Sequence, residues 1–246
     1  WKQAAVIEKS IQQTSFPNRV FNILDYGAVA NDTTVLNHEA INRAILACSL
    51  QGGGKVVVPA GVFLTGPITL KSDVNLYLEE GAKLLFSPRR ELYLPPVITR
   101  WEGNDCYNLH PLIYAYGETN FAITGKGILD GQGRPDTWWS LCGSARFGWR
   151  PGKPGQNMGG RDRLMRANEE QQPMENRIMG LDDALRPQFV NLVHCNRVLV
   201  EGVTLLNSPF WVIHPLLSRN LIFRNLTVSN DGPNGDGCDP ESCQNV

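Results

Sequence analysis

The feature that most constrains this chain is a repeat near its C-terminal end. Residues 189–228 contain two successive units of short apolar strands and turns, and the anchor residues Asn196, Asn220 and Asn245 lie 24 and 25 residues apart. An earlier copy occupies residues 112–131. Repeats of this length, with short strands and no helix in each unit, are typical of a solenoid whose turns bury their inner side chains against one another. The repeat predicts an all-β chain folded as a right-handed parallel β-helix.

Composition agrees with many short strands joined by turns. The chain of 246 residues contains 24 Gly and 16 Pro, and β-branched runs such as residues 55–58 are frequent. An antiparallel sandwich is the alternative, but it would require hairpin signals about every 8 to 12 residues and would not explain the asparagine spacing.

One helix is expected before the strands begin. Residues 38–48 place Ile41, Ala44, Ile45 and Cys48 on one face. Asn37 is the expected cap, and residues 52–54, all glycine, are the expected stop. We therefore expect one domain over residues 1–246, truncated at its C-terminal side. Its expected parts are an N-terminal cap and helix (1–50), the first turns (51–132), an inserted basic and aromatic loop (133–188) and regular turns (189–246).

The inserted loop interrupts the repeat and is rich in basic and aromatic residues. Residues 134–177 contain eight basic and five acidic side chains, together with Trp138 and Trp139. Such a loop could bind a sugar acid by stacking and charge. Alternatively, the two tryptophans pin the loop to the solenoid, and the sequence leaves both interpretations open.

Charge and hydropathy exclude several classes of protein. With 23 basic and 24 acidic residues the net charge is −1, which argues against a generally basic nucleic-acid binder. No stretch approaches the roughly 18 apolar residues of a membrane span. We therefore expect neither a nucleic acid nor a membrane as partner. Because the chain starts at Trp1 without a leader, any secretory signal is expected to be removed or to lie outside it.

Several motifs fail on inspection. The six cysteines lack the spacing of a metal site, so no metal is expected, and their pairing cannot be read from sequence. His38-Glu39 begins a zinc-protease pattern, but Asn42 stands where the second histidine ligand must be. The glycines at 52–54 precede a strand rather than the helix of a phosphate-binding loop, which indicates a turn.

The segment 230–243 is the strongest candidate for chemistry. It places Asp236 and Asp239 three residues apart in a glycine-rich turn between repeat strands. Taken alone, Asn-Gly and Asp-Gly pairs are ordinary turn chemistry. Carboxylates on a rigid scaffold are nevertheless what glycosidic cleavage requires, one to donate a proton and another to activate water.

Motifs along nearly the whole chain resemble those of the polygalacturonases, glycoside hydrolase family 28, and in particular its bacterial exo-acting branch. The resemblance is carried by Asp25-Tyr26-Gly27-Ala28, residues 52–61, Leu78-Glu79-Glu80-Gly81-Ala82, Ile123-Thr124-Gly125-Lys126-Gly127, Asn207-Ser208-Pro209-Phe210-Trp211 and Asn234-Gly235-Asp236-Gly237-Cys238-Asp239. The family usually has Thr at the place of Gly235.

The resemblance implies a pectin hydrolase that cleaves α-1,4-galacturonosyl linkages by an inverting mechanism without a cofactor. It implies that Asp236 helps to activate the attacking water and that Asp239 is a supporting carboxylate. The family's other two catalytic aspartates, in a G-D-D motif, are absent from this sequence. We therefore expect an N-terminal part of a longer enzyme, inactive by itself.

Five further residues are candidates for substrate binding. Asn234 belongs to the aspartate motif, and Trp211 and His214 lie one repeat before it. Arg100 and Trp101 precede a repeat and could close one end of a cleft, although both could equally belong to a packed turn, and His214 could be structural.

Three alternatives remain open from sequence. One is a rhamnogalacturonan hydrolase of the same family, another a calcium-dependent pectate lyase, and the third a β-helix that binds polysaccharide without cleaving it. A pectic polysaccharide or oligogalacturonide is the expected partner. The full-length protein is expected to be a secreted or periplasmic monomer.

Overall fold

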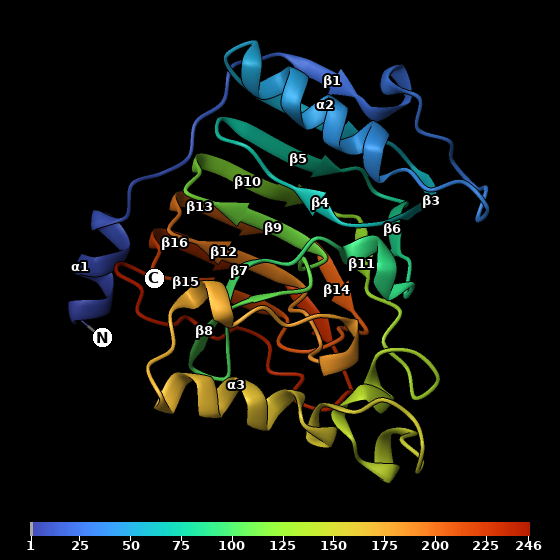
Figure 1. Cartoon of the computed structure of the whole chain (residues 1–246). Helices are drawn as coiled ribbons and strands as arrows, with labels where there is room; N and C mark the ends of the chain where they lie inside the picture. Colours follow the sequence, from blue (N-terminus) through green and yellow to red (C-terminus); the bar gives the residue numbers. More distant parts are fainter. Residues whose placement is uncertain (1) are drawn as a thin grey trace.

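The chain folds as a parallel β-helix in a computed structural model that describes residues 2–246 (Figure 1). Its turns contribute strands to three parallel sheets, in the orders β1-β2-β5-β10-β13-β16, β3-β6-β11-β14-β17 and β4-β9-β12-β15. In the described part of the chain, every strand pair except β7–β8 is parallel. The predicted β-helix is confirmed, and the antiparallel sandwich is wrong.

The strands are short, as the repeat requires. The first sheet contains β1 (Val20–Asn22), β2 (Gly54–Val58), β5 (Val74–Leu78), β10 (Thr119–Gly125), β13 (Asn196–Glu201) and β16 (Arg219–Arg224). The second contains β3 (Gly61–Thr65), β6 (Ala82–Phe86), β11 (Ile128–Asp130), β14 (Thr204–Leu206) and β17 (Thr227–Ser229). The third contains β4 (Ile68–Thr69), β9 (Ile113–Tyr116), β12 (Val190–Val193) and β15 (Ile213–Leu216).

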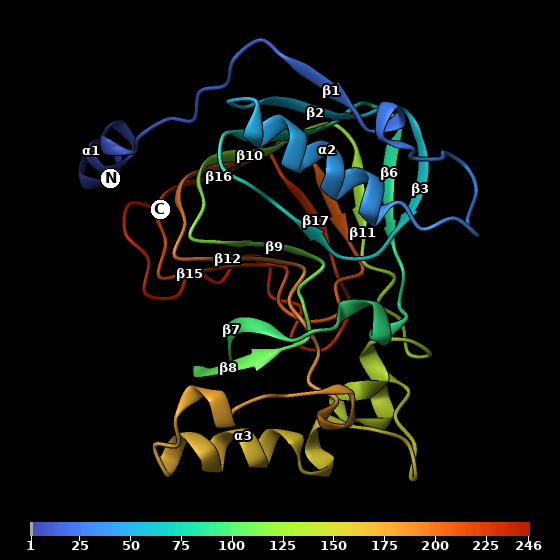
Figure 2. The ribbon, with the colours of Figure 1, turned by 45° about the horizontal axis from the view of Figure 1, so that its top comes forward.

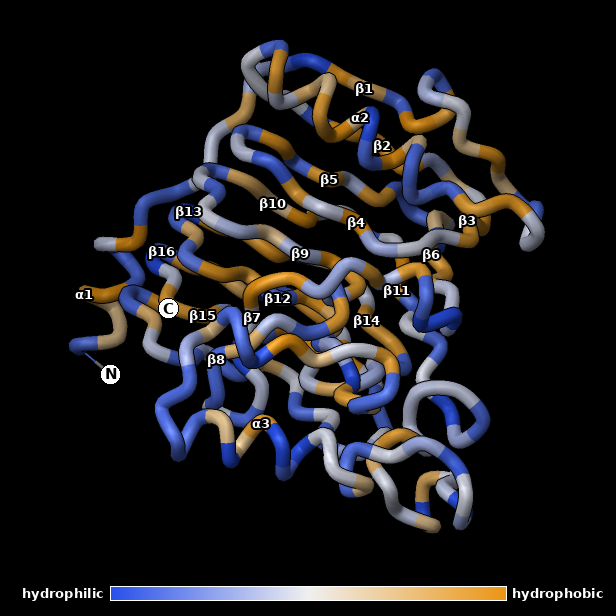
Figure 3. Tube along the Cα trace, viewed as in Figure 1, coloured by the Kyte–Doolittle hydropathy of each residue, from blue (hydrophilic) through white to orange (hydrophobic). Residues whose placement is uncertain are grey.

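The core lies inside the solenoid. Val56, Leu76, Ile123 and Val200 are in register on four successive turns, and each is completely buried. Their neighbours along each strand point outward because side chains alternate across a strand. Burial of each apolar side chain contributes about 1.5–3 kcal/mol. Figure 3 shows hydrophobic residues concentrated on the strands of the solenoid.

The anchor asparagines form a hydrogen-bonded ladder at one corner. Asn220 Nδ2 donates to Asn196 Oδ1 at 2.8 Å, and Asn245 Nδ2 donates to Asn220 Oδ1 at 3.2 Å. Asn220 and Asn245 both have a φ of 55°, a left-handed conformation that asparagine tolerates well. The strand register nevertheless pairs Asn196 with Arg219, so the ladder joins residues one position apart in the register.

Helix α2 (His38–Leu50) covers the N-terminal end of the solenoid (Figures 1 and 2). It buries the predicted face, including Ile41 and Ile45. Asn37 occupies the N-cap position, but its side chain does not cap the helix. It instead accepts from Val29 N at 2.7 Å and donates to Leu64 O at 3.0 Å, which ties the helix entry to a strand of the second sheet. Helix α1 (Lys2–Ser10) has no buried residue and lies beside the C-terminal turns.

An antiparallel hairpin of β7 (Val97–Trp101) and β8 (Asn104–Asn108) leaves the solenoid within residues 51–132, where the sequence predicted the first turns and no hairpin. Its turn residues, Glu102 (φ 44°) and Gly103 (φ 81°), are both left-handed, as in the tight turns that match strand twist. This hairpin lies between the third sheet and α3 (Gly160–Glu169), as Figure 2 shows. It forms a second core whose buried members are Trp101, Cys106, Leu164, Met179, Leu185 and Phe210.

Between β11 and β12 the chain forms α3 and short 3-10 turns at Trp139–Cys142, Ala145–Phe147, Gln156–Met158, Met174–Asn176 and Leu181–Asp183. Trp138 is buried and packs edge-on against Tyr93, with the two ring centres 5.4 Å apart. Trp139 Nε1 donates to Ser208 O at 2.9 Å. Of the two interpretations of these tryptophans, the contacts support pinning of the loop to the solenoid.

Candidate active site

The two motif aspartates lie on the turn that stacks on β15. This segment, residues 234–241, is called the aspartate turn below. Val212 N donates to Asp236 O at 2.9 Å, and Asp239 N donates to Ile213 O at 2.8 Å. A parallel bridge between Ile213 and Cys238 fixes the register. In this register Asp239 is the neighbour of His214 on the next turn of the solenoid. The solenoid therefore presents the aspartate turn at the edge of a rigid sheet.

His214 lies beneath this turn and is completely buried. Its Nδ1 is 3.0 Å from Asn191 Nδ2, an amide nitrogen that can only donate, and its Nε2 is 3.1 Å from Glu241 Oε2. The proton therefore belongs on Nε2. Burial lowers the pKa of His214, while the hydrogen bond to Glu241 opposes this shift. The His214 side chain is completely enclosed by these contacts, and its proposed contact with substrate stays a prediction.

Glu241 joins His214 to the hairpin. Its Oε1 accepts from Arg100 Nη1 at 2.9 Å, and Arg100 Nε donates to Asp105 at 2.7 Å. The bond to Asp105 raises the pKa of Arg100, and the bond to Glu241 acts in the same direction. The structure brings Arg100 to the site, as the sequence analysis proposed, but two carboxylates already hold its guanidinium group. Glu241 was missed in the sequence, although its spacing of two from Asp239 places both on one face of the turn.

Four aromatic rings connect the hairpin to the site. Trp101 stacks on Phe210, with ring centres 5.4 Å apart, and Phe210 stacks on Trp211, with ring centres 4.8 Å apart. Trp211 meets His214 edge-on, and their ring centres are 5.0 Å apart. Trp101 is completely buried, and its Nε1 donates to Arg186 O at 3.2 Å. The structure therefore places Trp101 in a packed turn, the other interpretation that the sequence left open, and its contact with substrate stays a prediction. Trp211 is partly exposed, and its contact with substrate stays a prediction.

Arg186, another residue missed in the sequence, holds the start of the aspartate turn. It is completely buried, and its Nη2 donates to Asn234 Oδ1 at 2.8 Å. Its Nη1 donates to Pro233 O at 2.7 Å and Pro209 O at 3.0 Å. Burial lowers the pKa of Arg186 to about 10, which leaves it charged at neutral pH. The hydrogen bond from Arg186 therefore fixes the side chain of Asn234. The proposed role of Asn234 in substrate binding stays a prediction.

The carboxyl group of Asp239 is in an environment that disfavours its charge. Its Oδ2 is buried and has no hydrogen-bond partner within residues 2–246. Burial, followed by the negative charge of Asp236, raises the pKa of Asp239 from 3.8 to about 6. Asp236 itself is exposed. The turn thus offers one accessible carboxylate beside one carboxyl group that keeps its proton in mildly acidic solution.

We expect Asp239→Asn to remove a pH dependence of stability. The unfolded chain ionises Asp239 near pH 3.8, whereas the folded chain holds the proton to about pH 6. The folded state therefore binds more protons in this window, and its stability falls as pH rises. With allowance for solvent screening, the free energy of unfolding falls by about 1–2 kcal/mol as the pH rises through this window. Urea unfolding from pH 3.5 to 7 measures it. Asp231→Asn is the control, and equal profiles for wild type and Asp239→Asn would contradict the expectation.

No group of three or more His, Cys, Asp or Glu side chains between residues 2 and 246 is placed to hold a metal ion. All six cysteines are unpaired. Within the same range, no helix has the length and apolar character needed to cross a membrane.

No family model matches the chain. A probable polygalacturonase of Vitis vinifera is 30% identical over 235 residues, which cover 92% of this chain and 40% of the relative. An exo-poly-alpha-D-galacturonosidase of Dickeya chrysanthemi is 40% identical over 123 residues, covering 47% of this chain and 20% of the relative. A hyperthermoactive exopolygalacturonase from Thermotoga maritima has a similar structure, with a TM-score of 0.95 and 45% identity over 99% of this chain and 54% of that chain.

The chain thus spans two fifths or less of these two sequence relatives and about half of the Thermotoga chain. The resemblance to polygalacturonases predicted from the motifs is confirmed, because the homologues carry that name.

Proposed function

We propose that this chain forms part of a glycoside hydrolase that cleaves α-1,4-galacturonosyl linkages of pectin. The observation that supports this most strongly is the pair Asp236 and Asp239 on the aspartate turn, one exposed and one with a raised pKa. An exposed carboxylate that can activate water, with a second carboxyl group beside it, is one half of the machinery that glycosidic cleavage uses. The homologues are named for this activity.

In the proposed mechanism, the exposed carboxylate of Asp236 accepts a proton from the attacking water. Asp239 supports Asp236 through its protonation state. An ionised Asp239 strengthens the attraction of Asp236 for the proton of the water, and a protonated Asp239 weakens it. An inverting reaction requires the acid and the base to lie roughly 6.5–9.5 Å apart, with the water between them. The family resemblance assigns the proton for the leaving oxygen to a further carboxyl group rather than to Asp239.

The family resemblance implies that this acid lies outside residues 1–246. The proposed enzyme is therefore active only with the residues that supply it. In this scheme, the partly exposed ring of Trp211 offers a stacking surface for a sugar beside the turn. The hydrogen bonds from buried Asn191 to buried His214, and from His214 to half-buried Glu241, hold the turn in place.

The substrate proposed is a pectic polysaccharide or oligogalacturonide, and the full-length protein is proposed to be a secreted or periplasmic monomer. Rhamnogalacturonan, lyase chemistry and binding without cleavage are the competing outcomes of the test.

The test incubates the full-length protein with polygalacturonic acid, with and without EDTA. We expect new reducing ends at equal rates in both samples, and a product whose anomeric configuration is inverted in the first NMR spectra. An unsaturated product formed only with calcium would identify a lyase. Retention of the polymer without new reducing ends would identify a binding protein, and cleavage of rhamnogalacturonan alone would identify the other hydrolase.

A further inference from the structure

A closed ring of hydrogen bonds joins the hairpin to the aspartate turn. Thr99 Oγ1 donates to Asn191 Oδ1 at 2.9 Å, and Asn191 Nδ2 lies 3.0 Å from His214 Nδ1. His214 Nε2 lies 3.1 Å from Glu241 Oε2, and Arg100 Nη1 donates to Glu241 Oε1 at 2.9 Å. Because Thr99 and Arg100 are neighbours on β7, the bonds return to the strand from which they start. These five residues are called the hydrogen-bond ring.

The centre of the hydrogen-bond ring is closed to solvent. Asn191 and His214 are completely buried, and Thr99 is 1% exposed. Two donors that face each other in such a place lose a hydrogen bond and cannot replace it with one to water. The direction of each bond, from donor to acceptor, therefore decides whether the ring holds together.

Two buried amides decide the direction of the ring at His214. Asn191 Nδ2 also donates to His214 O at 2.8 Å, and Gln188 Nε2 donates to Arg100 O at 2.9 Å while lying 3.3 Å from His214 Nδ1. Rotation of either amide would place its oxygen against one of these carbonyl oxygens. Both amides therefore present N–H groups to Nδ1, which must act as an acceptor. The proton of the neutral imidazole consequently lies on Nε2 and points at Glu241.

Glu241 must then accept hydrogen bonds at both of its side-chain oxygens. The Nε2–H group of His214 faces Oε2, and Arg100 faces Oε1. The backbone of Glu241 is also tied to the solenoid, because its N–H group donates to Pro215 O at 2.9 Å and its carbonyl oxygen accepts from Leu217 N at 3.0 Å. Together these bonds fix the C-terminal end of the aspartate turn.

We propose that Asn191, supported by Gln188, is a positioning residue for the proposed hydrolysis. By keeping His214 Nδ1 an acceptor, Asn191 directs the Nε2–H group to Glu241 and locks the aspartate turn to the hairpin. Its effect on the reaction passes through His214 and Glu241 rather than through the reacting atoms. The inference rests on the proposed function, because the turn that is held carries Asp236.

The experiment is a double-mutant cycle on the full-length protein with polygalacturonate as substrate. Glu241→Gln places an amide nitrogen against either His214 Nε2–H or Arg100, and the two fixed amides prevent His214 from moving its proton to Nδ1. We expect kcat to fall by about 10- to 100-fold with KM nearly unchanged, because the catalytic carboxylate is misplaced. Asn191→Asp/Glu241→Gln puts an oxygen beside Nδ1, so His214 holds its proton there and accepts from the new amide at Nε2. This reversed ring should regain about tenfold of the lost kcat.

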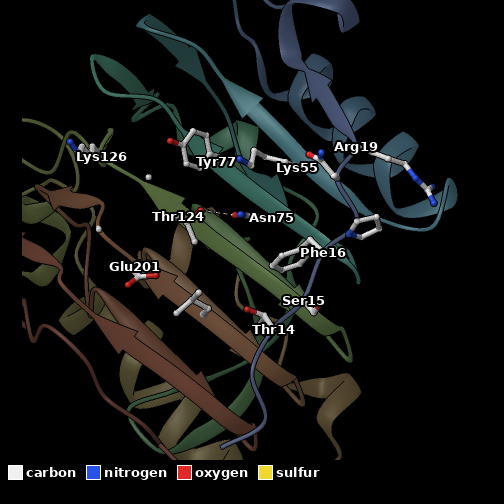
Figure 4. Close-up of a pocket in the computed structure, with 15 residues that line it drawn as sticks. Thr14, Ser15, Phe16, Arg19, Lys55, Asn75, Tyr77, Thr124, Lys126 and Glu201 are labelled. Carbon is white, nitrogen blue, oxygen red and sulfur yellow. Dashed lines mark hydrogen bonds between the residues drawn. The ribbon is translucent and has the colours of Figure 1, made fainter.

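The matched control is Asn75→Asp/Glu241→Gln. Thr124 Oγ1 donates to Asn75 Oδ1 at 2.8 Å, as drawn in Figure 4, so Asn75 also accepts from a threonine hydroxyl group. Asn75 lies on β5 in the first sheet, whereas the hydrogen-bond ring lies between the third sheet and the hairpin. The control therefore has the same net charge as the reversed ring but leaves His214 unchanged, and it should be as slow as Glu241→Gln. Thermal unfolding of every variant verifies that it is folded.

A second measurement does not depend on hydrolysis. NMR of the histidine ring nitrogens should show the His214 proton on Nε2 in the wild-type protein and on Nδ1 in Asn191→Asp/Glu241→Gln. A proton on Nδ1 in the wild type would overturn the inference, and so would wild-type kcat in Glu241→Gln. A reversed ring that does not fold, or that is no faster than the control, would overturn it as well. The two expected tautomers in a protein that releases no reducing ends would support the direction of the ring and refute the hydrolase.

Discussion

Replacing Asp236 with Asn is expected to lower the rate of polygalacturonate hydrolysis by about 10²- to 10⁴-fold, the usual contribution of a positioned base. The amide has nearly the same shape but cannot take a proton from water. Asp236 is exposed and forms no ion pair within the described chain, so the fold should be unchanged. The measurement is the initial rate of reducing-end formation by the full-length protein, with the thermal midpoint beside it.

Asp231→Asn is the matched control for this change. It removes a negative charge from an exposed aspartate five residues away and should leave the rate within about threefold of wild type. A further consequence concerns Asp239, since the charge of Asp236 contributes to its raised pKa. In Asp236→Asn the pKa of Asp239 should therefore fall, which NMR titration would detect. An Asp236→Asn variant that retains wild-type activity would refute the assigned role.

Arg186→Ala is expected to lower the free energy of unfolding by about 3–5 kcal/mol, because several buried neutral acceptors lose their donor, at about 1–3 kcal/mol each. Its removal would leave the carbonyl oxygens of Pro209 and Pro233 and the side chains of Gln156 and Asn234 without their donor. These groups belong to the inserted segment, the turn before β15 and the aspartate turn. The variant should therefore also lose hydrolytic activity, because Asn234 begins the turn that carries Asp236.

Urea denaturation measures this effect. Arg166→Ala, an exposed arginine on α3, is the control and should change stability by no more than about 0.5 kcal/mol. Arg186→Lys should lose most of the same stability, because a single ammonium group cannot reproduce the planar fork of donors. A loss below about 1 kcal/mol for Arg186→Ala would contradict the importance of the network.

The sequence predicts the solenoid well because each of its turns repeats the same local pattern. The asparagine spacing has a direct physical cause in the ladder of Asn196, Asn220 and Asn245. The buried face of α2 also follows from periodicity. The hairpin was missed because a two-residue Glu-Gly turn resembles the other turns of a chain so rich in glycine, and only its left-handed backbone identifies it.

The site could be predicted only in part. The motif locates Asp236 and Asp239, and family resemblance gives them roles. Trp101 was assigned to substrate because it precedes a repeat, and His214 because it lies one repeat before the aspartate motif. Neither position indicates what packs against the side chain. In the structure Trp101 belongs to the hairpin, and both side chains are completely buried. Arg186 and Glu241 were missed because their partners are distant in sequence, and a single arginine or glutamate carries no pattern of its own.

The bond between Arg100 and Glu241 also bears on the order of folding. The two residues are 141 positions apart in the chain, and the hairpin is further bonded to Asn191 and Arg186, 92 and 85 positions beyond its own residues. At a synthesis rate of about 5–20 residues per second, Glu241 emerges roughly 7–28 s after Arg100. The solenoid can grow turn by turn from α2, whereas the hairpin waits for contacts that do not yet exist. The neighbourhood of the aspartate turn is therefore completed only after all of the hairpin's partners up to Glu241 have been synthesised.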